Sequence, residues 1–559
     1  MGKVLTLALM FRLAGLAWGL PASDGWDDDG VAPRDFLVGV FETYSPGHYY
    51  TYPPLHLVIL AVASLPIWVV ALARCPSTEP AAVVQSFIAV PTMTALAVVA
   101  RAVTVALSLG ILWNVAKIAE DLRGTARAGI WVSLACAANI VFTYYSQTTN
   151  LDVPYLFWGL LAVRWLIHAF VRHEPRTLRR VPVLAALAIA TKDQAYALFL
   201  LSIPLSLLTF FAVDRRARAL ARPIFRELAY GTAIAAATLL VVDGAVTNSS
   251  GFGARLRFLL GPASQDHAFY ASDWTGRMSA LRDVVANFGQ HYAWVMAPFV
   301  LFGLATAWRS AGDPARRAAS LVPLFVAISF TVAFNLTARR TEHRFVLPQS
   351  IIWGIYAGLG FDAIASWLGP ARIWTMRALS GACLGSAFFA CASVDAAMLF
   401  DPRYDAESWL RAHVAPGDQI EIYDNDVHCI RLPPESVVAR IGLTPVVGRN
   451  PLPNVTELQD RFSNVEARRP RFIVVSDFWM DKYFVEPSAL ERQGRVASAV
   501  QTKTLADADS RIYFHSLRDG QLAYRTAHRS EYGHGLWPRL EIHGTLTGGV
   551  WIFEHLEGT

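Results

Sequence analysis

The chain has 559 residues, of which 54% are hydrophobic and only 17% are charged. A soluble domain usually carries about 25% charged residues, so this composition and the mean hydropathy of +0.35 exclude an ordinary soluble protein. The formal net charge of +5 does not indicate nucleic-acid binding, because the arginines stand in short loops between apolar runs, where the positive-inside rule expects them. Since a span takes roughly 20 apolar residues, we predict a polytopic α-helical membrane protein with roughly 11–13 transmembrane or re-entrant helices.

The first apolar segment covers residues 4–20 and contains Arg12. One interpretation is a cleaved signal peptide. We favour a retained first helix with its N-terminus in the cytoplasm, because Arg12 interrupts the apolar run and many further spans follow. The loop after this helix, residues 21–54, is then extracytoplasmic.

This first outer loop carries three consecutive carboxylates and then runs into Tyr52-Pro53-Pro54-Leu55; the carboxylates are Asp27, Asp28 and Asp29. Carboxylates at the mouth of a membrane-embedded core are costly and indicate a functional site. A base near a reacting hydroxyl is one role that suits them. The alternative is a solvated acidic loop.

The next apolar stretches leave two topologies open. Residues 55–73 and 82–99 either both cross the membrane or both lie at its interface or re-enter it. Both options place the basic loop 117–127 in the cytoplasm.

The later spans alternate more clearly, and their loops obey the same charge rule. The expected spans are 129–145, 153–171, 182–213 as two short helices broken near Thr191-Lys192-Asp193, 228–242, 292–308, 320–336, 345–367 and 374–398, with a polar loop over 243–290. This alternation puts the first outer loop, Asp152, Lys192, His343 and Arg344 on one side of the membrane, together with the C-terminus.

The composition changes after Phe400. Residues 405–414 are typical of an amphipathic helix, and 418–423 and 471–476 are typical of strands. We therefore predict a transmembrane domain over 1–399 and an extracytoplasmic soluble α/β domain over 400–559. Asp424-Asn425-Asp426 beside His428 could be metal ligands, but Asp and Asn favour turns, and we interpret them as a turn after a strand.

Four further polar residues are candidates for chemistry, each with a simpler alternative. Asp152 precedes Val153-Pro154, where a carboxylate can also cap a helix. Lys192 needs a partner in an apolar stretch, which is either a phosphate or Asp193. Arg344 is suited to gripping a phosphate, and His343 stands beside it; the alternative is an interfacial anchor for both.

The order of these motifs resembles the GT-C glycosyltransferases, and within them the branch of protein O-mannosyltransferases and aminoarabinose transferases. Asp28-Asp29 stand where that branch has an acidic pair before a Pro-Pro-Leu helix. Asp152-Val153-Pro154 resembles its second acidic position, Ala190-Thr191-Lys192 its Thr-Lys segment, and Arg344-Phe345-Val346-Leu347-Pro348 its Arg-aromatic-Leu-Pro segment. Three departures are that Asp29 replaces the usual Glu, that a third acid precedes the pair, and that the interval 58–100 is longer than in the compact form of the family.

The resemblance implies a polyprenyl-phosphate-linked sugar donor, an inverting one-step transfer of a hexosyl or pentosyl group, and an acceptor on the extracytoplasmic side of a bacterial cell membrane. The acceptor is left open between protein, lipid and polysaccharide. It implies Asp28 as the base with Asp29 as its partner, and Asp152 as the residue that orients the acceptor. Lys192, Arg344 and His343 would bind the donor phosphate.

Two questions stay open at this point. Some relatives use a divalent metal, for which Asp27, Asp28 and Asp29 are the possible ligands. The alternatives to an enzyme are a transporter or flippase of lipid-linked envelope intermediates, and a non-catalytic membrane scaffold. An enzyme requires Asp28, Asp152 and Arg344 in one cavity.

Overall fold

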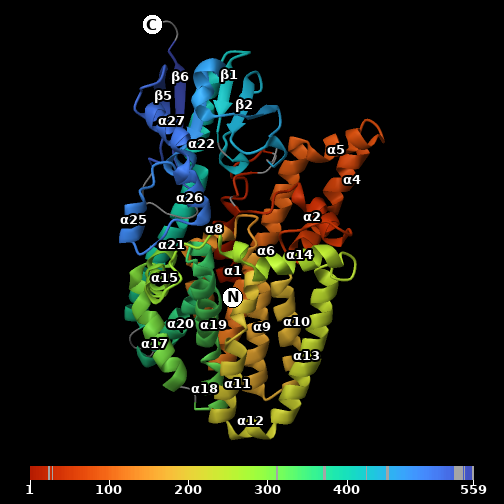
Figure 1. The fold of residues 1–559 in the computed structure, drawn as a ribbon. Coiled ribbons are helices and arrows are strands. Elements are labelled where there is room, and N and C mark those ends of the chain that lie inside the picture. Colours follow the sequence, from red (N-terminus) through yellow and green to blue (C-terminus); the bar gives the residue numbers. More distant parts are fainter. Residues whose placement is uncertain are drawn as a thin grey trace.

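The computed structural model of the chain describes residues 1–22, 25–27, 29–309, 312–368, 373–423, 425–448, 452–533, 546 and 548–556. Within these residues, a long helical bundle carries a smaller domain with a mixed sheet on one end (Figure 1). The predicted fold class, a polytopic helical membrane protein with an α/β domain after the bundle, is confirmed.

Among the described residues, seven helical segments are long and apolar enough to cross a membrane, or nine if two bent helix pairs are counted. The seven are Val90–Arg123 (α6), Asp152–Arg172 (α9), Asp193–Val213, Ala221–Val242 (α13), Pro314–Arg339, His343–Leu368 (α20) and the segment from Trp374. The protein is therefore an integral, multi-pass membrane protein. The number of helices predicted from the sequence was larger because that prediction also counted short and re-entrant helices.

Several expected spans are built from shorter helices. The first is α1 (Gly2–Leu13), which ends earlier than predicted, and 129–145 is divided into α7 (Ala126–Ala137) and α8 (Ile140–Tyr145). The predicted break near Thr191-Lys192-Asp193 lies between α10 (Arg180–Ile189) and η2 (Asp193–Leu198), and α11 (Ser202–Val213) follows. The remaining elements of this part are η1 (Pro175–Arg179), α12 (Arg215–Ala219), η4 (Trp294–Met296), α17 (Ala297–Arg309), α18 (Pro314–Ala319), α19 (Val322–Phe330), the π-helix η5 (Thr331–Arg339) and α21 (Ile373–Leu399).

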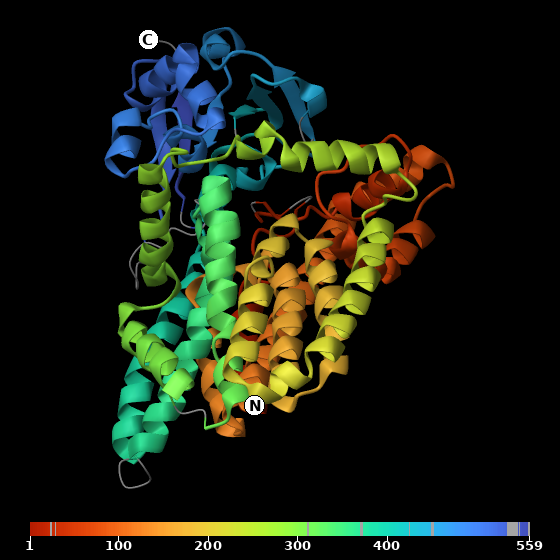
Figure 2. The same cartoon turned by 60° about the horizontal axis from the view of Figure 1, so that its bottom comes forward.

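The expected polar loop 243–290 is largely helical. It contains α14 (Ser249–Leu260), η3 (Pro262–Gln265), α15 (Trp274–Ala286) and α16 (Phe288–His291). The side chains of Asn248 and Asp273 cap the first and third of these helices by accepting from Gly251 N and Gly276 N, as short polar side chains at helix starts do. Figure 2 shows α14 lying across the end of the bundle that carries the C-terminal domain.

The open topology of residues 55–88 is resolved by helix lengths. After α2 (Asp35–Tyr44) the chain forms α3 (Leu55–Ala63), α4 (Leu65–Ala73) and α5 (Pro80–Ile88). A crossing by α3 and α4 would need α5 to cross back, but its nine residues rise only about 14 Å, against roughly 30 Å of hydrocarbon. The following α6 is one continuous helix of 34 residues, so 82–99 is no separate span. Residues 55–88 therefore begin and end on one side, at the end of the bundle that carries the C-terminal domain (Figure 1).

The C-terminal domain contains a sheet of six strands within the described residues, in the order β3-β2-β1-β4-β6-β5. The strands are β1 (Gln419–Ile422), β2 (Val437–Gly442), β3 (Val455–Gln459), β4 (Phe472–Ser476), β5 (Tyr524–Ser530) and β6 (Val550–His555), and β1 to β4 run parallel. β6 pairs antiparallel with both β4 and β5. The helices and 3-10 turns are α22 (Pro402–His413), η7 (Asp426–His428), η8 (Val446–Gly448), η9 (Phe462–Asn464), α23 (Val465–Arg468), α24 (Asp477–Asp481), α25 (Pro487–Arg492), α26 (Ala499–Ala506) and α27 (Ala508–Arg518).

The first outer loop and the residues directly before it are fastened to this domain. Trp18 Nε1 donates to Asp401 Oδ2 at 2.9 Å, and Trp26 Nε1 donates to the Cys429 carbonyl at 3.1 Å. The Arg431 guanidinium donates to the Leu20 carbonyl at 2.7 Å. The loop and the domain therefore share one end of the bundle, and the arginine-rich α12 lies at the opposite end (Figure 1).

Candidate active site

Four charged side chains from distant parts of the chain meet at the domain end of the bundle, and we call them the charged cluster: Asp29, Asp152, Lys192 and Arg344. Lys192 Nζ lies 2.8 Å from Asp152 Oδ1, and Arg344 forms an ion pair with Asp29. Both cations lie against one ring, because Lys192 Nζ is 5.7 Å and Arg344 Cζ is 4.6 Å from the centroid of Phe345. The predicted meeting of Asp152 and Lys192 with Arg344 is thus a feature of the structure.

The cluster is graded from buried to open. The Asp152 side chain is 0% exposed and Lys192 is 14% exposed, whereas Arg344 is 11% and Asp29 is 40% exposed. Burial lowers the pKa of Lys192, and the nearby carboxylate of Asp152 opposes this shift. Charged side chains that are this strongly buried in a membrane protein need partners of opposite charge or a ligand.

Asp152 is not a helix cap. The N-cap of α9 is Leu151, and the structure gives it no side-chain cap hydrogen bond. Asp152 Oδ1 instead accepts from Lys192 and, at 3.2 Å, from Gln194 Nε2. Its second oxygen, Oδ2, is buried and has no hydrogen-bond partner among the described residues. A buried carboxylate oxygen without a donor is costly, which favours a ligand at this position.

The partner of Lys192 is Asp152, and the alternative partner Asp193 is engaged elsewhere. Asp193 forms an ion pair with Arg255 of α14, whose side chain is 4% exposed. The guanidinium of Arg255 also lies 5.2 Å from the ring centroid of Tyr50 in the first outer loop. Arg255 therefore holds the segment that carries Lys192 against the loop, a role that no sequence pattern indicated.

Asp27 points away from the charged cluster. Its two oxygens accept from Arg101 Nε at 3.1 Å and Arg101 Nη2 at 3.2 Å, and Oδ2 also accepts from Thr149 N. Arg101 Nη1 donates to the carbonyls of Leu16 and Trp18. This buried pair fastens the loop to α6, so Asp27 lacks a free oxygen for the metal role that the sequence left possible.

The neighbouring acids behave differently. Asp28 lies outside the described residues, so its predicted role as the base stays a prediction. Asp29 has φ +54°, a left-handed conformation that is rare for residues other than glycine and typical of strained functional turns. Among the described residues, no group of three His, Cys, Asp or Glu side chains could hold a metal ion.

No ion pair connects His343 to the charged cluster among the contacts described above. His343 lines a cavity of about 620 Å³ between α15, residues 341–343 and the C-terminal domain, which we call the polar cavity. Its ring is 6.4 Å from that of buried His291. A phosphate role for His343 alongside Arg344 stays a prediction.

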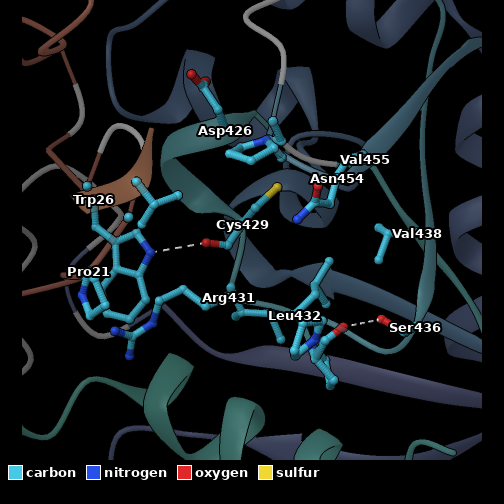
Figure 3. Close-up of a pocket in the computed structure, with 18 residues that line it drawn as sticks. Pro21, Trp26, Asp426, Cys429, Arg431, Leu432, Ser436, Val438, Asn454 and Val455 are labelled. Atoms are coloured by element: carbon cyan, nitrogen blue, oxygen red, sulfur yellow. Dashed lines mark hydrogen bonds between the residues drawn. The ribbon is translucent and has the colours of Figure 1, made fainter. Parts of the chain in front are cut away.

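A second cavity of about 490 Å³ lies between the first outer loop and the N-terminal ends of β2 and β3. Figure 3 shows Pro21 and Trp26 on one side of it and Val438, Asn454 and Val455 on the other. Arg431 on its wall is bound to Glu407 and Leu20.

Tyr52 belongs to the surroundings of the charged cluster, although sequence reasoning gave it no role. Partial burial raises its pKa, and the charge of Asp29 acts in the same direction. The signal was its place directly before Pro53-Pro54, which brings α3 to the cluster: Leu55 N donates to the Ala190 carbonyl at 3.0 Å, two residues before Lys192.

No family model matches the chain, and no curated protein matches it. Among solved structures it is similar to ArnT from Cupriavidus metallidurans bound to undecaprenyl phosphate, with 15% identity over 98% of this chain and 97% of that one and a TM-score of 0.52. The apo ArnT structure from the same organism aligns at 17% identity over 86% of this chain and 93% of that one, with a TM-score of 0.48. The chain therefore shares the overall fold of the ArnT structure bound to undecaprenyl phosphate.

Proposed function

We propose that this protein is a membrane glycosyltransferase that moves a sugar from a polyprenyl-phosphate-linked donor to an acceptor on the extracytoplasmic side. The observation that carries the proposal is the charged cluster, in which two cations lie beside one aromatic ring and each is paired with a carboxylate. The protein shares its fold with an ArnT bound to undecaprenyl phosphate, and this similarity supports a donor in which the sugar is linked to a lipid phosphate. The positive-inside rule assigns the arginine-rich end to the cytoplasm, and so the cluster to the other side.

Lys192 and Arg344 each have N–H groups that could donate hydrogen bonds to a phosphate. Lys192 Nζ carries three N–H groups, of which one donates to Asp152. Arg344 Nε is buried without a hydrogen-bond partner among the described residues. Charge-assisted hydrogen bonds from both would stabilise the negative charge that develops on the leaving phosphate.

The transfer is a single displacement. The acceptor oxygen forms a bond to the anomeric carbon while the bond from that carbon to the phosphate oxygen breaks, and the electron pair leaves with polyprenyl phosphate. The acceptor proton passes to a carboxylate of the first outer loop, for which Asp28 is our choice and Asp29 its partner. Attack opposite the leaving phosphate inverts the anomeric configuration. Asp152 would orient the acceptor through its free Oδ2.

The experiment uses the purified full chain in lipid vesicles, with radiolabelled lipid-linked sugars from a bacterial membrane extract and a cell-envelope fraction as acceptor. We expect the wild type to transfer label and release polyprenyl phosphate, and Asp28→Asn to insert and fold but not transfer. Full turnover by that variant would exclude Asp28 as the base. A flippase would move intact lipid-linked sugar across the vesicle without breaking its bond to phosphate, which would contradict the proposal.

A further inference from the structure

The polar cavity joins three parts of the chain that are far apart in sequence. Its walls come from α15 and α16, from residues 341–343, and from residues 490–501 of the C-terminal domain. Its volume of about 620 Å³ is within the range of roughly 300–1,000 Å³ that small-molecule sites occupy. Phe269 and Val496 connect two of these walls, since Val496 N donates to the Phe269 carbonyl at 2.9 Å.

The charges on the walls are balanced. Asp283 accepts from Arg282 at 3.1 Å and from Arg495 at 3.2 Å, and it also accepts from the Tyr270 hydroxyl at 2.7 Å. Glu342 is paired with Arg340 at 2.5 Å. Because the cations already face carboxylates, the cavity is poorly suited to a strongly anionic ligand.

Amide side chains provide the remaining polar surface. Asn287 donates to the carbonyls of Asp283 and Thr341, which leaves its side-chain oxygen as an acceptor. Gln290 and Gln493 also line the cavity. An amide group offers both donors and an acceptor, and each sugar hydroxyl likewise donates and accepts. The amide side chains on the cavity wall can therefore hydrogen-bond to a neutral ligand that carries several hydroxyl groups.

Sequence adjacency connects this cavity to the charged cluster. His343 lines the cavity, while the next residue, Arg344, pairs with Asp29. Both stand in the first turn of α20. A ligand seated in the cavity would thus contact the residue directly before the one that we assign to the leaving phosphate. The cavity of Figure 3 has no such link and is lined mainly by proline and aliphatic side chains.

We propose that the polar cavity binds the acceptor and that the acceptor is a carbohydrate, presented as a neutral sugar unit with free hydroxyls. This inference rests on the glycosyl transfer proposed above. One hydroxyl of the bound sugar would extend past His343 to the charged cluster and become the attacking oxygen.

The first test changes the acceptor. The envelope fraction is oxidised with periodate, which cleaves neighbouring hydroxyls of sugars, and is then reduced with borohydride. We expect transfer to the untreated fraction and loss of transfer to the oxidised one. Undiminished transfer after oxidation would overturn the carbohydrate assignment while leaving the transferase intact. If the wild type transfers to neither fraction, the proposed function itself fails and this inference fails with it.

The second test fills the cavity. Ala286 is an exposed residue of α15 on its wall, so Ala286→Trp occupies the cavity without disturbing a core. We expect the KM for acceptor to rise by about tenfold or more with donor binding unchanged, which is the signature of lost acceptor binding. Val285→Trp, at an exposed neighbour that does not line the cavity, is the matched control. Equal KM values for the two variants would contradict the acceptor role of the cavity.

Discussion

Two aspartates in the same loop, Asp27 and Asp29, each pair with an arginine, but the two pairs differ in burial. We use this difference to assign one pair to the anchoring of the loop and the other to the proposed reaction. The Arg101 and Asp27 side chains are 0% and 3% exposed, and every contact of this pair is within the chain's own core. The Arg344 and Asp29 side chains are 11% and 40% exposed. A buried, fully bonded pair fixes the loop, whereas the function we propose requires the half-open pair beside Lys192 to exchange its carboxylate partner for a phosphate.

The largest expected effect is at the buried pair. Replacing Arg101 by Ala leaves the Asp27 carboxylate buried without its partner, and such a change costs about 3–5 kcal/mol. We expect little folded protein in detergent, measured by size-exclusion chromatography and thermal unfolding. The double change Arg101→Met with Asp27→Leu should recover folded protein, because it removes both charges. Normal folding of Arg101→Ala would show that the loop does not depend on this pair.

Replacing Arg344 by Ala should leave folding nearly intact and reduce transfer. Loss of one preorganised donor to a developing oxyanion typically lowers kcat by about 10²–10³-fold. The measurement is turnover with lipid-linked sugar, together with binding of radiolabelled undecaprenyl phosphate. Arg127→Ala is the control, because Arg127 forms an ion pair with Asp362 at 2.7 Å outside the charged cluster. Similar turnover for both variants would remove the phosphate role of Arg344.

An intermediate effect is expected at the second pair of the cluster. Lys192→Met leaves Asp152 without its charged partner, so both stability and phosphate binding should fall. Adding Asp152→Asn should restore the thermal stability but not the binding of undecaprenyl phosphate. Recovery of binding in the double variant would mean that Lys192 serves only to neutralise Asp152.

The smallest effect is expected at a surface contact between the loop and the C-terminal domain. Arg34 lies 3.2 Å from Asp426, and their side chains are 24% and 11% exposed. Pairs near the surface contribute about 0–1 kcal/mol. We expect Arg34→Ala to change the unfolding temperature only slightly and to retain transfer. A loss as large as that of Arg101→Ala would show that the loop depends on this contact with the domain as much as on its pairing with α6.

The order of the spans and the break at Thr191-Lys192-Asp193 followed from apolar length and arginine placement, because membrane insertion depends on those two properties. Asp152, Lys192 and Arg344 were found because charge in an apolar segment is rare. The separate roles of Asp27 and Asp29 were not predictable, since three identical residues in a row give no sign of which one turns inward. Which aspartate turns inward depends on the conformation of Asp29 and on the position of Arg101, which lies 74 residues after Asp27 in the sequence.

The helices within 243–290 and the position of His343 on the wall of the polar cavity could not be predicted from the sequence either. Short helices rich in polar residues carry a weak periodic signal, and they form here because Asn248 and Asp273 cap them. His343 and Arg344 are adjacent in sequence, but neighbours in a helix point in different directions. A shared phosphate role for His343 and Arg344 therefore stays a prediction.

The most direct test compares turnover per folded molecule for Asp27→Asn and Asp29→Asn, with the amount of folded protein measured by size-exclusion chromatography. The division of roles predicts less folded protein for Asp27→Asn but wild-type turnover by the fraction that folds. For Asp29→Asn it predicts normal folding with strongly reduced turnover. The reverse pattern, an inactive but stable Asp27→Asn and a fully active Asp29→Asn, would contradict it.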